Sequence, residues 1–304
     1  MPHERVAILM ATLNGAAFVD AQIRSLVSQT HTHWRLWVSD DGSVDDTLGI
    51  IRRTAGRKLA RVIRGPGAGF AQNFLHLLRQ VPAGHYVAFC DQDDIWHRDK
   101  LGRALTQLRG NQGPAMVCAA TQPCDTALLP IGPPAYRDAP RLCFENALVQ
   151  NQAPGNTIVL NPAAVAALKP ASKAAWAVPA HDWWAYLCLS AMDAPLIWDP
   201  TPVVLYRQHA ANAIGSNQGA RARMRRIHRL LNGTYAGWIS ANLSALRPIH
   251  EQMPDRNRLL LERFCRSRRH PAHRRVQFAI NPPVCLSNTH AQRAWQVAHA
   301  LGCT

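Results

Sequence analysis

The first 120 residues alternate short apolar runs with segments whose apolar residues recur at helical spacing. The apolar runs cover residues 6–10, 36–38, 61–63, 86–90 and 116–120. Between two of them, Phe74, Leu77, Leu78 and Val81 fit one face of a helix. This alternation predicts an α/β fold, a mostly parallel sheet with right-handed helical crossovers. In such sheets ligands bind at the carboxyl ends of the strands.

The run of residues 86–90 stops at three carboxylates in four positions: Asp91, Asp93 and Asp94. Carboxylates crowded at a strand end repel one another, so we expect a cation among them. Mg²⁺ suits this place because it binds one or two carboxylates together with waters and substrate phosphates. Polar clusters also end the first two runs, at Thr12–Asn14 and Asp40–Asp41. The alternative without a functional role, for each cluster, is a solvent-exposed turn before a helix.

The second half is less regular. We expect a loop and strand over residues 155–160, a helix from Pro162, an apolar helix from His181 to about Met192, and a strand within residues 196–206. Beyond about residue 219 the composition becomes Arg-rich. We therefore expect a sheet domain over residues 1–215 and a helical Arg-rich C-terminal extension over residues 216–304.

The charge is strongly positive, +15 over 304 residues, and it is concentrated in that extension. Residues 221–275 hold fourteen arginines against three acids, and five of the arginines crowd one segment: Arg221, Arg223, Arg225, Arg226 and Arg229. Such a surface attracts nucleic acid or the anionic face of a membrane. The alternative is a basic helix packed on the sheet domain through Met224, Ile227, Leu230 and Leu231.

The eight cysteines show no C-x-x-C spacing, which argues against a zinc site. No run approaches eighteen apolar residues, and no signal peptide pattern precedes the first strand. We expect a cytoplasmic protein, peripheral at the inner membrane face if the basic extension binds lipid.

Seven motifs in order resemble family 2 glycosyltransferases of the rhamnosyltransferase-like subgroup. They are V-A-I-L-M-A-T-L-N-G, S-D-D-G-S-V-D-D-T, G-F-A-Q-N-F, F-C-D-Q-D-D-I-W, G-N-T, H-D-W-W and Y-R-Q-H, and they span about residues 5–215. Ala11 and Leu13 depart from the proline and tyrosine that are frequent in the first motif. That departure concerns base stacking and leaves metal chemistry untouched.

The resemblance implies a GT-A fold and a role for each motif. It implies that the nucleotide is bound by Thr12, Asn14, Asp40, Asp41, Asn73 and Asp91. It implies that a Mn²⁺ or Mg²⁺ ion is bound by Asp93, Asp91 and His209, and that Arg207 contacts the leaving diphosphate. The implied acceptor pocket is lined by Gly155, Asn156, Thr157, Trp183 and Trp184.

Asp182 is the implied catalytic base. An inverting transfer needs one base on the acceptor side, opposite the leaving diphosphate. Burial at the start of an apolar helix would raise the pKa of Asp182, and the helix N-terminus would lower it. The alternative for Asp182 is a plain helix cap.

The function implied is transfer of L-rhamnose or another hexose from a dTDP- or UDP-sugar to a glycan or lipid-linked saccharide in surface polysaccharide synthesis. A sugar nucleotidyltransferase would need a basic phosphate loop after the first strand, but residues 12–17 hold no basic residue. A nucleic-acid-binding module would interleave basic and aromatic residues. Residues 221–275 hold only Tyr235, Trp238 and Phe264, so we expect no nucleic acid partner.

Overall fold

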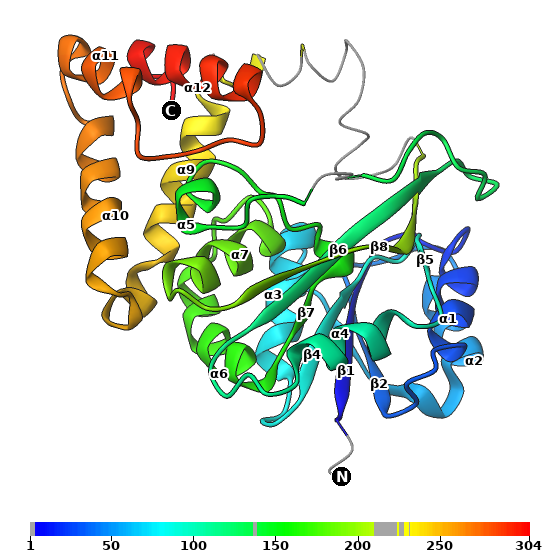
Figure 1. Cartoon of the computed structure of the whole chain (residues 1–304). Coiled ribbons are helices and arrows are strands. Elements are labelled where there is room, and N and C mark those ends of the chain that lie inside the picture. Colours follow the sequence, from blue (N-terminus) through cyan, green and yellow to red (C-terminus); the bar gives the residue numbers. More distant parts are fainter. Residues whose placement is uncertain (1–3, 136–138, 210–223, 225–227, 231) are drawn as a thin grey trace.

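A computed structural model describes residues 4–135, 139–209, 224, 228–230 and 232–304. It has one eight-stranded sheet in the order β3-β2-β1-β4-β7-β6-β8-β5 (Figure 1). The strands are β1 (Val6–Thr12), β2 (Trp34–Asp40), β3 (Leu59–Arg64), β4 (Tyr86–Cys90), β5 (Ile95–Trp96), β6 (Met116–Cys124), β7 (Val159–Leu160) and β8 (Leu196–Arg207). The expected α/β fold is confirmed.

The longer strands pair in parallel as expected, β6 with β8 included, and the antiparallel pairs that make the sheet mixed all involve the short strands β5 and β7. β1 pairs in parallel with β2 and β4, and β2 with β3. β7 is antiparallel to both β4 and β6, and β5 is antiparallel to β8. β5 and β7 have two residues each, too few to show any periodicity in sequence.

Both faces of the sheet are covered by helices. Val6, Ile8 and Met10 of β1 belong to a core shared with α1, α2 and α4, whereas Ala7 and Leu9 belong to a core shared with α3, α6 and α7. This burial on both sides is why the strands read as continuous apolar runs. The helices are α1 (Val19–Val27), α2 (Thr47–Ala55), α3 (Phe70–Gln80), α4 (Lys100–Leu108), α5 (Phe144–Ala147), α6 (Pro162–Ala171) and α7 (His181–Ala191).

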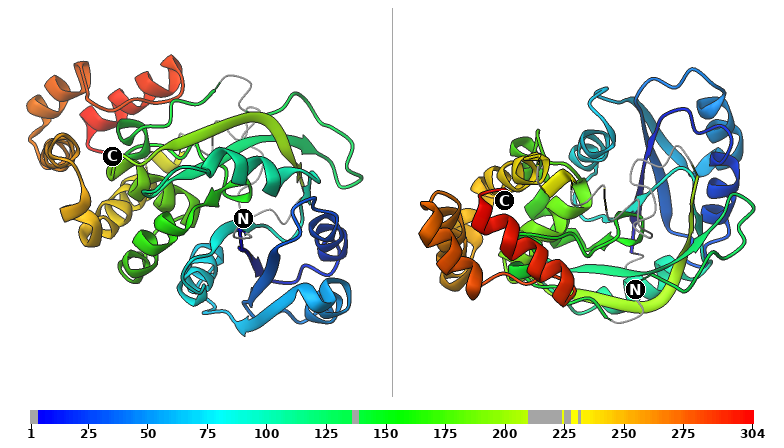
Figure 2. Two further views of the ribbon diagram at one scale, coloured as in Figure 1. Left: turned by 60° about the horizontal axis from the view of Figure 1, so that its bottom comes forward. Right: turned by 90° about the horizontal axis from the view of Figure 1, so that it is seen from above.

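The C-terminal extension is helical where the structure describes it, with α9 (Thr234–Ala245), α10 (Asp255–Arg268), α11 (Ala272–Ile280) and α12 (Thr289–Leu301). Two further views place these helices at the opposite end of the molecule from α1 and α2 (Figure 2). Ile239, Phe264 and Trp295 join the same core as α7. Asn257 Nδ2 donates to the carbonyls of Ser190 (3.3 Å) and Ala191 (2.9 Å) at the end of α7.

The expected domain boundary at residues 215 and 216 lies outside the described residues. So do Arg221, Arg223, Arg225, Arg226, Ile227 and Leu231 of the expected basic helix. Met224 is described and is exposed. None of the helices in the described part of the chain is both long and apolar enough to cross a bilayer.

Candidate active site

Asp40, at the carboxyl end of β2, is held by the residues around it. Its Oδ1 accepts hydrogen bonds from Thr12 Oγ1 (2.9 Å) and Ser43 Oγ (2.5 Å), and its Oδ2 accepts from the Ser43 amide (2.8 Å). Burial would raise the pKa of Asp40, but the hydrogen bonds from Ser43, Thr12 and Gly42 outweigh it and lower that pKa. Asp40 is therefore an ionised acceptor at this strand end.

The loops after β1, β2 and β3 lie against one another. Asn14, whose φ is +49°, accepts the Val44 amide at Oδ1 (2.9 Å). Asp41 Oδ1 accepts the Gly67 amide (3.0 Å). A Cβ on Gly65 would lie only 2.1 Å from Asp41 Oδ1, so that approach requires glycine.

Asn73, on α3, is buried rather than on the surface of its helix. Its Nδ2 donates to the Ser39 carbonyl (3.0 Å), and its Oδ1 has no hydrogen-bond partner among the described residues. A buried acceptor left open is costly. This oxygen lies close to Gly65, at the edge of the sheet where Asp40 and Asp41 lie.

The three carboxylates after β4 differ in their surroundings. Asp94 is fully buried and accepts from Asn156 Nδ2 (2.6 Å) and the Arg207 amide (3.2 Å). Burial, then the charge of Asp93, raises the pKa of Asp94 to about 8. Burial, then the charges of Asp94, Asp93 and Asp182 in that order, raises the pKa of Asp91. Asp182 therefore lies within electrostatic reach of this cluster.

Asp93 contacts His209 directly, with 2.8 Å between Oδ2 and Nε2. The His209 ring stacks on Phe18, with centroids 4.6 Å apart. Within the described residues, no three His, Cys, Asp or Glu side chains are grouped so as to hold a metal alone. The donor set nevertheless fits a divalent ion, because Mg²⁺ and Mn²⁺ sites take few protein ligands and are completed by substrate oxygens and water.

Arg207 is buried at the end of β8. Its Nε donates to the Asp93 carbonyl (2.8 Å) and its Nη1 to the Thr126 carbonyl, and its guanidinium lies 4.9 Å from the centre of the Phe18 ring. These contacts attach the loop that carries Asp93 to the end of β8. They also place a fixed positive charge beside the expected diphosphate position.

Asp182 lies in the first turn of α7 and is not its N-cap, which is Ala180. Its Oδ2 accepts from Asn151 Nδ2 (2.9 Å) and the Gly155 amide (3.1 Å). Burial raises the pKa of Asp182 more than the Trp183 amide, Asn151 and Gly155 lower it. Of the two opposed effects that the sequence left open, burial is the larger. A raised pKa suits a general base near neutral pH.

The Gly155–Thr157 turn connects the two carboxylate groups. Gly155 donates to Asp182, and the next residue, Asn156, donates to Asp94. A Cβ on Gly155 would lie 3.0 Å from Asp182 Cβ, so only glycine fits easily here. Thr157 is buried, and its Oγ1 accepts the Ala119 amide (3.0 Å).

The two tryptophans of H-D-W-W lie in the core. Trp184 is 0% exposed and offers no surface to a sugar. Trp183 is 5% exposed, and its Nε1 donates to the Ala147 carbonyl (2.7 Å). Both side chains pack α7 into the core. Trp184 therefore does not form the expected apolar wall for an acceptor.

Several residues that build the site were not identified from sequence. Gln92 exchanges two hydrogen bonds with the backbone of Leu13 (3.1 and 3.0 Å) and so joins the loops after β1 and β4. His181 stacks on Phe74 beside the base. Lys100 is buried with its Nζ 3.2 Å from the centre of the Trp96 ring. Gln92 and His181 had a sequence signal, their positions inside D-Q-D and H-D-W-W, whereas Lys100 had none.

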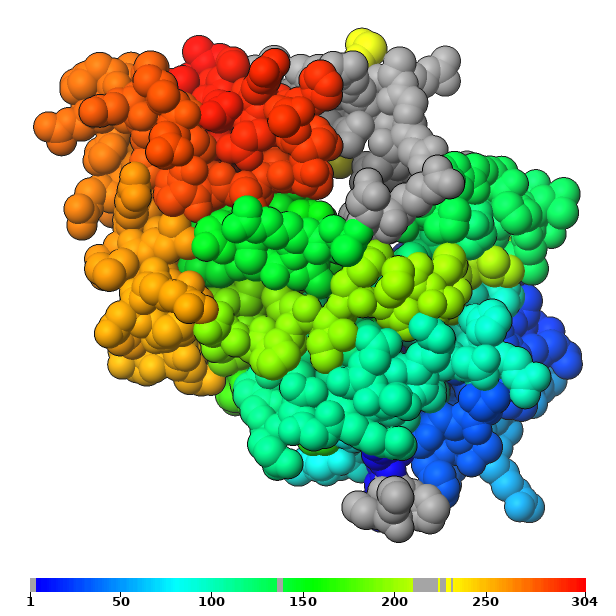
Figure 3. Space-filling view, in the orientation of Figure 1, coloured from blue at the N-terminus to red at the C-terminus, as the bar shows by residue number. Residues whose placement is uncertain are grey.

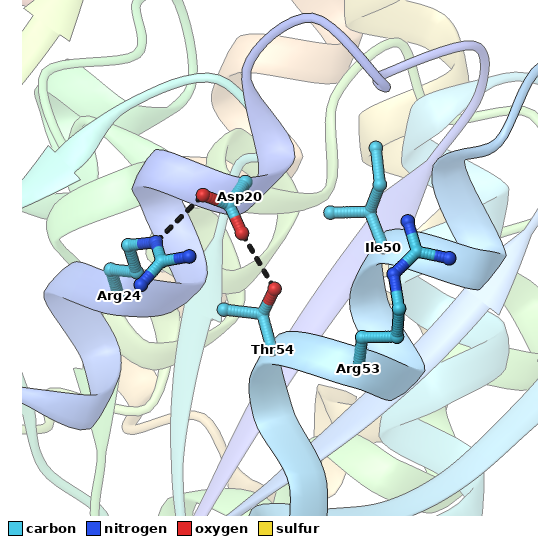
Figure 4. A pocket seen from close by; sticks show the side chains of 5 residues that line it. All are labelled: Asp20, Arg24, Ile50, Arg53 and Thr54. Carbon is cyan, nitrogen blue, oxygen red and sulfur yellow. Dashed lines mark hydrogen bonds and ion pairs between the residues drawn. The ribbon is translucent and has the colours of Figure 1, made fainter.

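A surface pocket of about 590 Å³ lies away from this site, between α1 and α2 (Figure 4). Asp20 within it accepts from Arg24 Nε (2.7 Å) and Thr54 Oγ1 (2.6 Å). These bonds are internal to the protein, and the pocket does not reach the carboxyl ends of the strands.

Sequence comparison gives matches along most of the chain. Residues 7–150 match the family model of glycosyl transferase family 2. The dTDP-rhamnosyl transferase RfbG of Shigella flexneri is 28% identical over 250 residues, which are 78% of this chain and 84% of RfbG. The UDP-Glc:alpha-D-GlcNAc-diphosphoundecaprenol beta-1,3-glucosyltransferase WfgD of Escherichia coli is 32% identical over 108 residues, 35% of this chain and 42% of WfgD.

Solved structures share the fold. TarS 1-349 of S. aureus, in complex with UDP, matches with a TM-score of 0.55 at 13% identity, covering 96% of this chain and 78% of TarS 1-349. The mannosyltransferase PcManGT of Pyrobaculum calidifontis, in complex with GDP-Man and Mn²⁺, matches with a TM-score of 0.53 at 18% identity. This match covers 98% of this chain and 86% of PcManGT. These matches show a glycosyl transferase family 2 region over residues 7–150, and a GT-A-like fold shared with TarS 1-349 and PcManGT over nearly the whole chain.

Proposed function

We propose that this enzyme is an inverting glycosyltransferase that moves a hexose, L-rhamnose first among the candidates, from a nucleoside diphosphate to a saccharide or lipid-linked acceptor. One observation carries the proposal: the adjacent residues Gly155 and Asn156 donate hydrogen bonds to Asp182 (3.1 Å) and to Asp94 of the acidic cluster after β4 (2.6 Å), so one turn joins the two groups. A donor held at the cluster therefore has a candidate base beside it.

The nucleotide is assigned to the loops after β1, β2 and β3. Thr12 and Asn14 order these loops, and Asp40 is the ionised carboxylate among them. Asp40 suits the ring N–H of a uracil or thymine, because a carboxylate accepts hydrogen bonds and does not donate them. Asp41, Asn73 and Asp91 complete the nucleotide contacts in this proposal.

A divalent ion is assigned to Asp93 and His209, with Asp91 beside them. When bound, it would neutralise charge on the leaving diphosphate. Arg207 adds a positive charge that its contacts with Asp93 and Thr126 hold in place. The protein thus positions positive charge beside the diphosphate that leaves the donor sugar.

Asp182 is proposed to accept the proton of the attacking acceptor hydroxyl. Asn151 and Gly155 fix one carboxylate oxygen, and burial makes the group more basic than an exposed aspartate. Gly155 and Asn156 shape the acceptor side through Asp182 and Asp94, and Thr157 anchors their turn. Trp183 backs this side from the core.

The donor and acceptor classes are inferred from relatives. RfbG is named for dTDP-rhamnose, and WfgD for UDP-Glc and a diphosphoundecaprenol acceptor. RfbG matches over far more of the chain, which is why a dTDP-deoxysugar comes before a UDP-hexose. A role in surface polysaccharide synthesis at the inner membrane face follows from such an acceptor.

The test is a donor panel of dTDP-L-rhamnose, UDP-glucose and GDP-mannose with Mn²⁺ or Mg²⁺, in which release of nucleoside diphosphate is measured with and without saccharide acceptors. We expect turnover with dTDP-L-rhamnose that is lost in EDTA. Release of pyrophosphate from a nucleoside triphosphate and a sugar phosphate would instead support a nucleotidyltransferase. Full activity in EDTA would contradict the metal assignment.

A further inference from the structure

The α11–α12 pair carries an apolar outer surface. Val276 and Ile280 on α11 are 48% and 75% exposed, and Val297 and Leu301 on α12 are 60% and 63% exposed. Each pair is spaced four residues apart, so its members share one helix face. Exposed apolar pairs on two neighbouring helices make this part of the surface a candidate interaction site.

The two helices lie antiparallel, side by side. Arg275 Nε, in α11, donates to the Ala300 carbonyl near the end of α12 (3.4 Å), and Gln296 Nε2 donates to the Ile280 carbonyl (3.5 Å). Phe278 and His299 pack between them, with ring centroids 5.0 Å apart. These inner residues separate the contact side of each helix from its exposed apolar pair. We call the exposed pairs, Val276 with Ile280 and Val297 with Leu301, the apolar ridges.

The charge around the ridges has one sign. Residues 263–304 contain seven arginines and no Asp, Glu or Lys. Arg293 is exposed four residues before Val297, on the same face of α12, and Arg274 is exposed on α11. A second copy of this chain would bring arginines against arginines. Nucleic acid would match the charge but leave the apolar ridges without a partner.

We infer that the apolar ridges, with Arg293, dock on an anionic lipid bilayer. The aliphatic side chains enter the boundary between headgroups and acyl chains, and the long side chain of Arg293 reaches the phosphates. Space-filling shows α10 to α12 as an outlying lobe of the molecule (Figure 3). β1 runs toward the side of the molecule on which α11 and α12 lie (Figure 1). The inference rests on the proposed function only in that a lipid-linked acceptor gives the docking a purpose.

Vesicle sedimentation tests this surface. The double variant Ile280→Asp/Val297→Asp removes one side chain from each ridge. The matched control Val27→Asp/Leu129→Asp makes the same change of charge at exposed apolar positions outside the extension. We expect wild type and control to bind vesicles of phosphatidylglycerol and phosphatidylcholine at low salt, and the ridge variant to bind at least about tenfold more weakly.

Three results would overturn the inference: no binding by wild type, equal binding to pure phosphatidylcholine, or equal weakening in the ridge variant and the control. Circular dichroism checks that each variant is folded. Donor hydrolysis without vesicles is the separate readout of the proposed function. Its absence in a wild type that binds vesicles would contradict the enzyme's proposed donor and leave the docking surface standing.

Discussion

His181 makes stability depend on pH in a way that can be calculated. Its ring stacks on Phe74 with centroids 3.9 Å apart and meets Phe89 edge-on at 4.7 Å. Both ring nitrogens lack a hydrogen-bond partner among the described residues. Burial lowers the pKa of His181 to about 3. An unfolded histidine takes up its proton near pH 6.5, so between those values the unfolded state binds more protons.

The contribution of His181 to the free energy of unfolding is therefore constant above pH 6.5 and falls as the pH drops from 6.5 toward 3. The slope approaches 1.36 kcal/mol per pH unit, so the loss at pH 5 is about 2 kcal/mol. The raised pKa values of Asp91, Asp94 and Asp182 act the other way, because these folded carboxylates bind protons more tightly than unfolded ones. The wild-type pH profile alone is therefore not diagnostic.

The assay is urea unfolding of wild type and His181→Met at pH 7 and pH 5. Methionine has a similar volume and does not titrate. We expect the free energy of unfolding of wild type, relative to the variant, to fall by about 2 kcal/mol between the two pH values. His273→Met, at an exposed position on α11, controls for replacing a histidine. The reasoning is refuted if the difference between wild type and His181→Met is the same at both pH values.

Further predictions concern the proposed base, the metal site and the extension. Asp182→Asn should keep donor affinity in a titration but lower kcat by about 10²–10⁴-fold, and near-normal turnover would move the base elsewhere. Gly155→Ala should lower kcat by pressing a methyl against Asp182, whereas Gly113→Ala, with open space around it, should not. Asp93→Ala should abolish metal-stimulated donor turnover, and a variant still stimulated by Mn²⁺ would contradict its role. Asn257→Ala should lower the free energy of unfolding by about 1–3 kcal/mol, because two buried carbonyls at the end of α7 lose their donor; an unchanged urea midpoint would argue against this.

The fold of the first 120 residues was predictable because strands buried on both faces and helices with one buried face leave clear patterns. Phe74, Leu77 and Leu78 are buried on α3 as their spacing predicted. β5 and β7 were not predictable, since two residues carry no period. Their antiparallel pairing depends on turns such as Gly155–Thr157, whose direction the sequence does not encode locally.

The residues of the candidate site that follow strands or stand in motifs were predictable from the sequence. The residues that hold them in place were not. Asp40, Asp91 and Asp182 stand in motifs, so their positions could be proposed from spacing. Asn151 holds Asp182 from a segment with no motif, and Lys100 is buried where a lysine is expected to be exposed. Such partners come together through tertiary packing.

The burial of α7 on every side has a consequence for synthesis of the chain. All eleven of its residues are buried, and part of that cover comes from helices made last, through residues such as Ile239 and Phe264. At typical translation rates the residues after His209 take on the order of 5–20 s to emerge. During that interval α7, the apolar helix that carries Asp182, is not yet covered by the C-terminal helices. Chaperone demand should therefore peak late in translation, and ribosome stalling within the extension should promote aggregation.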